Sequence, residues 1–235
     1  MKLVLKMLKI IGLIVLALSV NIIPMLLIGN QSRIPVELQW GCGLAYIGIA
    51  AGVISLVWKR YRSHISEAAK SLKFGWKDFG IALLFFVATR VVAVGGTVLN
   101  QLIYGNTMTG NDAALMANLE DLKSMFPLFF ICFHLAIGVF APILEELVFR
   151  GFMSEYFFKG KHMIWQLVLT SLVFGMLHVS NFGNFVEIGL YFALGAIFYL
   201  AFNRRRNIVD SIAVHLLNNC LLVIISVISY LSLIF

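Results

Sequence analysis

The feature that most constrains this chain is a succession of long apolar runs separated by shorter polar or charged stretches. Several runs approach or exceed the roughly 20 residues that a helix needs to cross about 30 Å of hydrocarbon. Seven can be placed, at about residues 10–29, 40–58, 79–99, 126–150, 164–181, 186–202 and 209–231. Since 61% of the residues are hydrophobic and only 12% are charged, a soluble fold is not a serious option. The sequence therefore predicts an all-α fold, a polytopic transmembrane helical bundle of about seven spans (six to eight).

The positions of Lys and Arg predict the orientation, because cytoplasmic loops carry an excess of them. With a cytoplasmic N-terminus, fourteen of the eighteen fall in inner segments, namely Lys2, Lys6, Lys9, Lys59, Arg60, Arg62, Lys70, Lys73, Lys77, Lys159, Lys161, Arg204, Arg205 and Arg206. All four tryptophans lie at predicted ends of spans, where indole rings prefer the headgroup level. Topology thus accounts for the net charge of +7, and no nucleic-acid partner is indicated.

The spans divide into two regions. Residues 1–125 hold three spans, a basic connector at 59–78 expected on the inner membrane surface, and an outer connector at about 100–125. Residues 126–235 hold the other four spans. The cysteines lie in different apolar spans without CxxC spacing, so neither a disulfide framework nor a thiolate metal site is expected.

Polar side chains inside the spans are the candidate functional residues, because an ionised group at bilayer depth usually faces a partner or a cavity. They are Arg90, Glu145, Glu146, Arg150, His178, His215, Asn218 and Asn219. Arg90 has no acid near it in sequence, so it either snorkels outward or pairs across helices. The remaining histidines are interpreted as ordinary hydrogen-bonding residues.

The charges of the fourth span fall into two groups. Glu146 and Arg150 are four residues apart in the order that favours a helical ion pair, so we expect them to neutralise each other. Glu145 points about 100° away around the helix and needs another partner. Pro142 lacks an N–H, which leaves a carbonyl of the preceding turn unpaired and can kink the helix.

Helical spacing predicts which of these side chains meet. Glu145 and His178 lie about 22 and 27 Å along their helices from the turn near residue 160, and His215 lies about 15 Å from the turn at 203–207. Phe174 shares a helix face with His178, and His215 shares one with Asn219. We therefore expect Glu145, His178, His215 and Asn219 to form one cluster. A desolvated glutamate beside imidazoles and an amide suits hydrolysis.

Three short motifs occur in order on successive spans: "EELVFR" at 145–150, "FGMLH" at 174–178 and "HLLNN" at 215–219. Together they match the pattern EExxxR, FxxxH, HxxxN, and the chain from about 126 to 230 resembles the CAAX protease and bacteriocin-processing (Abi) family of intramembrane proteases. The resemblance implies a membrane-associated peptide or protein substrate. It also implies that residues 126–235 are the catalytic core.

The same resemblance assigns roles to the motif residues. Glu145 would act as general base on a water, assisted by His178, while His215 and Asn219 would hold the oxyanion. Glu146, Arg150 and Phe174 would support the site. A metal-free glutamate mechanism with no cofactor is favoured; the alternative is zinc, with Glu145, His178 and His215 as ligands. Peptide maturation, bacteriocin immunity and membrane signalling in a bacterial cytoplasmic membrane are all compatible with the family.

Two functions of other classes compete with proteolysis. A membrane scaffold that regulates a signalling partner would use the polar cluster only for structure. A proton- or metal-coupled transporter would also contain intramembrane Glu and His, but the chain shows no inverted repeat. The substrate and the oligomeric state do not follow from the sequence.

Overall fold

The computed structural model describes residues 2–117, 124–159 and 161–234, and its regular elements are helices. The first part comprises α1 (Lys2–Gly29), the short 3₁₀ turn η1 (Gln31–Arg33), α2 (Val36–Arg62), α3 (Glu67–Ser71), α4 (Trp76–Tyr104) and α5 (Gly110–Ala117). The second comprises α6 (Pro127–Leu135), η2 (Ala136–Phe140), α7 (Ala141–Glu146), η3 (Leu147–Phe158), α8 (Met163–Leu177), α9 (Phe185–Asn203) and α10 (Ile208–Ile234).

Within these residues, six helices are long and apolar enough to cross a membrane, and α8 is a shorter apolar helix of 15 residues. The prediction of an all-helical membrane protein with about seven spans is therefore confirmed. The fourth span extends beyond its predicted end at residue 150, because α6, η2, α7 and η3 run on as one helix from Pro127 to Phe158. The fifth ends at Leu177 rather than 181, because the chain then turns at Asn181, whose side chain accepts a hydrogen bond from the Gly183 N–H.

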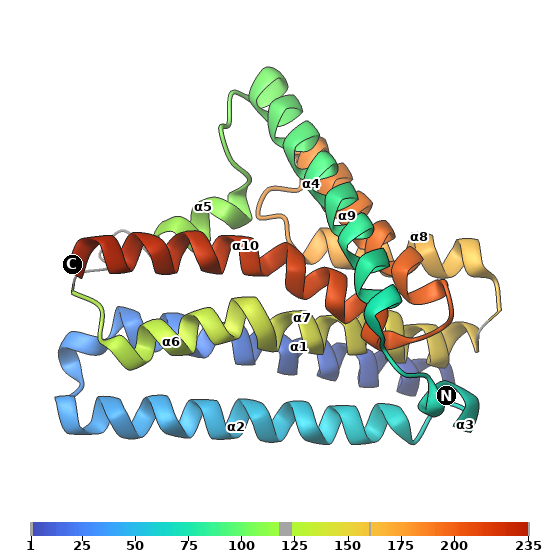
Figure 1. The fold of residues 1–235 in the computed structure, drawn as a ribbon, viewed down its shortest axis with the longest axis horizontal. Coiled ribbons are helices and arrows are strands. Elements are labelled where there is room, and N and C mark those ends of the chain that lie inside the picture. Colours follow the sequence, from blue (N-terminus) through green and yellow to red (C-terminus); the bar gives the residue numbers. More distant parts are fainter. Residues whose placement is uncertain (1, 118–123, 160, 235) are drawn as a thin grey trace.

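The continuous helix α6–η3 forms the centre of the bundle. In its apolar segment 72% of the residues are buried, against 17–28% in α1, α2, α4 and α10. In Figure 1, α1, α2, α6–α7 and α10 run along the long axis, while α4 and α9 cross them obliquely. One hydrophobic core includes residues of α1, α2 and α4 as well as the second half of the chain. The helix that carries both glutamates is thus surrounded by protein.

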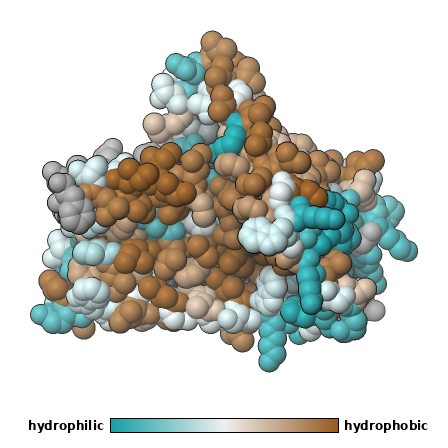
Figure 2. Space-filling model, viewed as in Figure 1, coloured by the Kyte–Doolittle hydropathy of each residue, from teal (hydrophilic) through white to brown (hydrophobic). Residues whose placement is uncertain are grey.

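The outer helices present apolar side chains to their surroundings, as expected for lipid contact. On α4, Leu84, Val91 and Leu102 are 71%, 68% and 76% exposed. Figure 2 shows the apolar surface over the middle of the molecule, with hydrophilic residues concentrated at the end that holds α3 and the start of α4.

At this charged end a compact ion-pair network ties α4 to the turn between α9 and α10. Arg204 contacts Asp78 at 2.6 Å and Asp210 at 2.8 Å, and Arg205 contacts the same two carboxylates at 3.0 and 2.7 Å. Asp78 also accepts a hydrogen bond from the Gly75 N–H at the start of α4. The network fixes the ends of three helices whose other halves surround the cavity described next.

Candidate active site

The predicted pair of Glu146 and Arg150 lies at the centre of the molecule. Both side chains are 0% exposed, and Arg150 Nη1 donates to Glu146 Oε1 over 3.0 Å. Arg150 Nη2 donates to the Gly195 carbonyl of α9 at 2.7 Å. The same Glu146 oxygen also contacts His215 Nδ1 at 2.9 Å. Glu146 therefore joins α7 to α10, and Arg150 joins η3 to α9.

This contact fixes the tautomer of His215. A carboxylate that already pairs with an arginine accepts hydrogen bonds, so His215 Nδ1 carries a hydrogen and donates it to Glu146. Nε2 is then free and lies 3.9 Å from Glu145 Oε2. The ring is stacked on Phe198, with centroids 4.3 Å apart, which fixes its plane.

His178 is oriented by the same principle. It is the first residue after α8, and its Nδ1 donates to the Phe174 carbonyl at 2.8 Å. Its Nε2 therefore faces Glu145 Oε2, at 3.6 Å. The ring lies between Phe174 and Tyr191, with centroid distances of 4.2 and 5.2 Å. Phe174 itself is 2% exposed and also contacts the Arg150 guanidinium, 4.8 Å from its centroid.

Three acceptor atoms consequently converge: Glu145 Oε2 and the Nε2 atoms of His178 and His215. Glu145 Oε2 has no hydrogen-bond partner within the part of the chain that is described. Three acceptor atoms this close together can share one proton, or they can accept hydrogen bonds from a donor such as a water molecule. These ligand types also suit zinc. However, no group of three or more His, Cys, Asp or Glu side chains among the described residues is arranged to hold a metal ion.

Asn219 reaches the cluster through an irregularity in the central helix. The segment η2 is π-helical, and at its end the Ala141 N–H donates to the Ala136 carbonyl five residues earlier. In this register the donor for the next carbonyl, that of Ile137, would be residue 142, but proline has no N–H. Asn219 Nδ2 donates to the Ile137 carbonyl instead, at 2.8 Å. The carbonyl that Pro142 leaves unpaired therefore binds α10 to the central helix.

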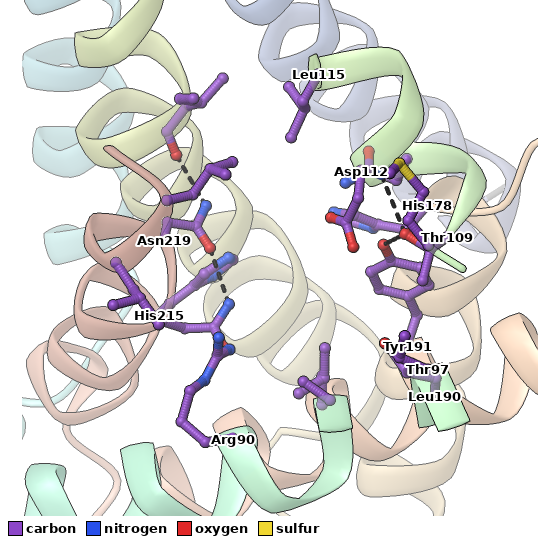
Figure 3. A pocket seen from close by; sticks show the side chains of 18 of the residues that line it. Arg90, Thr97, Thr109, Asp112, Leu115, His178, Leu190, Tyr191, His215 and Asn219 are labelled. Carbon is purple, nitrogen blue, oxygen red and sulfur yellow. Dashed lines mark hydrogen bonds between the residues drawn. The ribbon is translucent and has the colours of Figure 1, made fainter. Parts of the chain in front are cut away.

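Two cavities meet at Glu145. The larger, of about 420 Å³, lies between α4, α5, α9 and α10, and its lining includes Glu145, His178, His215 and Asn219 together with Arg90, Asp112 and Tyr191 (Figure 3). The smaller, of about 230 Å³, lies on the side of α1 and shares Glu145, His178 and Asn219 with the first. All four predicted cluster members thus line the larger cavity, and Glu145 is accessible from two sides.

The structure also brings to these cavities residues to which sequence reasoning gave no role. Asn21 of α1 lines the smaller cavity, and its side chain interacts with the Glu145 carboxylate. Its position as a polar residue inside the first apolar run was the signal that could have identified it. Asp112 belongs to α5 in the outer connector, where an acid is unremarkable in sequence. Burial raises the pKa of the Asp112 carboxyl, because α5 places it inside the cavity.

Arg90, for which two interpretations were open, pairs across helices. Its Nη2 donates to Asn218 Oδ1 on α10, and the guanidinium lies 5.5 Å from the Phe86 ring centroid. His134 fits its structural interpretation, since its Nε2 forms a hydrogen bond of 2.8 Å with Ser226 on α10.

Comparisons with known proteins match the part of the chain that carries the three motifs. Residues 127–221 match the family model for type II CAAX prenyl endopeptidase Rce1-like proteins. The matched region contains all three motifs and the central helix. This region is similar to the CAAX protease family.

The curated relatives that match the chain are bacterial proteins. The chain is 28% identical over 155 residues to the membrane-embedded CAAX protease MroQ of Staphylococcus aureus, covering 63% of this chain and 56% of that protein. It is 25% identical over 161 residues to the putative membrane peptidase YdiL of Bacillus subtilis, covering 66% and 61%. A third relative is the UPF0177 protein YbdI of Lactococcus lactis, 31% identical over 94 residues, covering 40% and 48%. The alignments thus span about half to three fifths of each relative. No solved structure matches the chain significantly.

Proposed function

We propose that the protein is an intramembrane endopeptidase of the bacterial cytoplasmic membrane that hydrolyses a peptide bond in a membrane-associated protein or peptide. The observation that carries this proposal is the convergence of Glu145 Oε2 with the Nε2 atoms of His178 and His215 in a cavity at the centre of the bundle. Membrane peptidases among the curated relatives support the same reaction class.

In the proposed mechanism Glu145 is the general base. It takes one proton from a water while the water oxygen attacks the carbonyl carbon of the scissile bond. His178, held by its Nδ1–H bond to Phe174, accepts the second hydrogen of that water through Nε2 and aims the attack. When the tetrahedral intermediate collapses, the C–N bond breaks and Glu145 returns its proton to the departing amine.

The oxyanion is stabilised by His215 and Asn219. Because His215 Nδ1–H is bound to Glu146, His215 donates to the oxyanion through Nε2 as an imidazolium, which carries a hydrogen on both ring nitrogens. Asn219 Nδ2 carries two hydrogens; one is bound to the Ile137 carbonyl and the other is available to the oxyanion. No step of this mechanism passes through a metal or another cofactor.

Peptide profiling in the native host tests the proposal. We compare wild type, Glu145→Gln and His215→Ala, matched for protein level, by mass spectrometry of membrane-derived and secreted peptides. The control is His134→Ala, since this buried histidine bonds Ser226 and does not line either cavity. Specific peptides should disappear from both active-site variants and persist in the control. Unchanged peptides and phenotype in Glu145→Gln would favour the scaffold function.

Metal dependence is tested on the purified protein with the peptide so identified. We expect cleavage to persist after prolonged chelation and to gain nothing from added zinc. Loss of cleavage on chelation, restored by zinc, would replace the metal-free mechanism with a metal-assisted one.

A further inference from the structure

We propose that Arg90 and Asn218 are positioning residues that hold the Asn219 amide in the orientation required for oxyanion binding. This inference rests on the proposed function. Arg90 lies on α4, outside the region that matches the protease family, and Asn218 is next to the motif residue without being part of the motif. Three consecutive hydrogen bonds connect Arg90 to the central helix.

The first bond sets the nitrogen end of Asn219. Because Pro142 cannot donate to the Ile137 carbonyl, that carbonyl needs a donor, and Asn219 Nδ2 supplies it at 2.8 Å. An amide turned by 180° would present an oxygen to this carbonyl oxygen, which is repulsive. The contact therefore favours one of the two orientations of the amide.

The second and third bonds set the oxygen end. Asn219 Oδ1 accepts a hydrogen bond from Asn218 Nδ2 at 3.0 Å. When the Asn218 nitrogen donates to Asn219, the Asn218 oxygen lies on the opposite side of the amide. On that side Asn218 Oδ1 accepts a hydrogen bond from Arg90 Nη2. An arginine is a donor at every nitrogen, so it permits only this orientation of Asn218. The direction of each bond in the series is thus determined by Arg90 at one end and the Ile137 carbonyl at the other.

The surroundings of Arg90 support this role. Among the described residues Arg90 has no salt-bridge partner, its Nε is buried without a hydrogen-bond partner, and the acid that acts on it electrostatically is Asp112. An arginine inside a membrane protein costs more to bury than a neutral side chain that could join the same two helices, which argues against simple helix-to-helix attachment. Figure 3 shows Arg90, His215 and Asn219 on one side of the cavity, opposite Asp112, His178 and Tyr191. The cationic end of the series therefore polarises donors on the side where the oxyanion would form.

Asn218→Asp distinguishes positioning from attachment. An aspartate at this position keeps an oxygen for Arg90 and adds an ion pair, so the link between α4 and α10 becomes stronger. It cannot donate to Asn219 Oδ1, so the amide loses the contact that fixes its oxygen. We expect kcat to fall by on the order of 10²-fold, comparable to removing one oxyanion donor, with KM little changed and thermal stability maintained.

Arg90→Met combined with Asn219→Ala completes the test. If Arg90 acts through Asn219, the double variant is no slower than Asn219→Ala alone, and Arg90→Lys, which still donates to Asn218, recovers part of the activity. All variants are measured as full chains in membranes, on the peptide lost in Glu145→Gln. Wild-type kcat in Asn218→Asp, or multiplicative losses in the double variant, would overturn the positioning role while the protease function stands. If Glu145→Gln releases the same peptides as wild type, the protease function fails and the positioning role fails with it.

Discussion

The buried pair of Glu146 and Arg150 allows a quantitative prediction about stability. Both side chains are 0% exposed, so Glu146→Gln keeps the shape of the side chain and leaves the Arg150 charge buried without its counter-charge. Breaking such a pair costs about 3–5 kcal/mol of unfolding free energy. For a chain of this length, this corresponds to a decrease in Tm of about 6–20 °C.

Adding Arg150→Met to the same variant should restore most of this loss, because no unpaired charge remains. The Gly195 carbonyl loses its arginine donor, which costs about 1 kcal/mol. His215 keeps an acceptor, since glutamine retains Oε1. Activity should not recover, because the negative charge beside His215 is absent from both variants.

A thiol-reactive dye provides the assay. Cys132 is 0% exposed and becomes reactive only when the bundle opens, so a background in which Cys42 and Cys220 are alanine reports unfolding from a single position. Melting curves are recorded in detergent for wild type, both single variants and the double variant. The reasoning is refuted if Glu146→Gln melts within about 2 °C of wild type, or if the double variant is as unstable as the single one.

Three further predictions follow from other parts of the structure. Pro142→Ala supplies the missing N–H to the Ile137 carbonyl and releases Asn219, so we expect unchanged or higher Tm with kcat lowered by about tenfold, measured by melting and by peptide cleavage. Asp210→Asn weakens the ion-pair network at the charged end and should lower the unfolding free energy by about 1–3 kcal/mol in the same melting assay. Burial raises the pKa of Asp112 above its ordinary value, although a hydrogen bond with Thr109 and the positive charge of Arg90 oppose the shift. The packed state of α5 is therefore most stable at low pH and loses stability as the pH rises through that pKa. Hydrogen exchange of α5 should therefore become faster, relative to the intrinsic rate, as the pH rises above the ordinary pKa of an aspartate, and Asp112→Asn should abolish this dependence.

The sequence predicted the elements of this fold well because membrane spans are defined by length and apolarity, which are local properties. It also predicted the pair of Glu146 and Arg150, since both residues lie on one helix at a spacing of four. The grouping of Glu145 with His178 and His215 depended on depth, for which the turns at 159–161 and 203–207 gave values from about 15 to 27 Å, a spread of about two helical turns.

Other parts of the site required the three-dimensional structure. No local sequence pattern predicts the π-helical register before Pro142. The hydrogen bond from Asn219 to the Ile137 carbonyl depends on that register, so it could not be predicted either. Arg90 and Asn21 come from spans whose rotation relative to the core depends on packing. The functional roles of Glu145, His178, His215 and Asn219 stay predictions until their variants are assayed.

The arrangement of charges on the central helix also bears on how the protein is made. Glu146 and Arg150 belong to one helix and can neutralise each other as soon as that helix leaves the ribosome and enters the insertion machinery. The two histidines that face Glu145 are synthesised later, His178 just after α8 and His215 on α10. During biogenesis the membrane therefore has to accept the Glu145 carboxyl group before either histidine is present, and the active site is completed only when α10 joins the bundle.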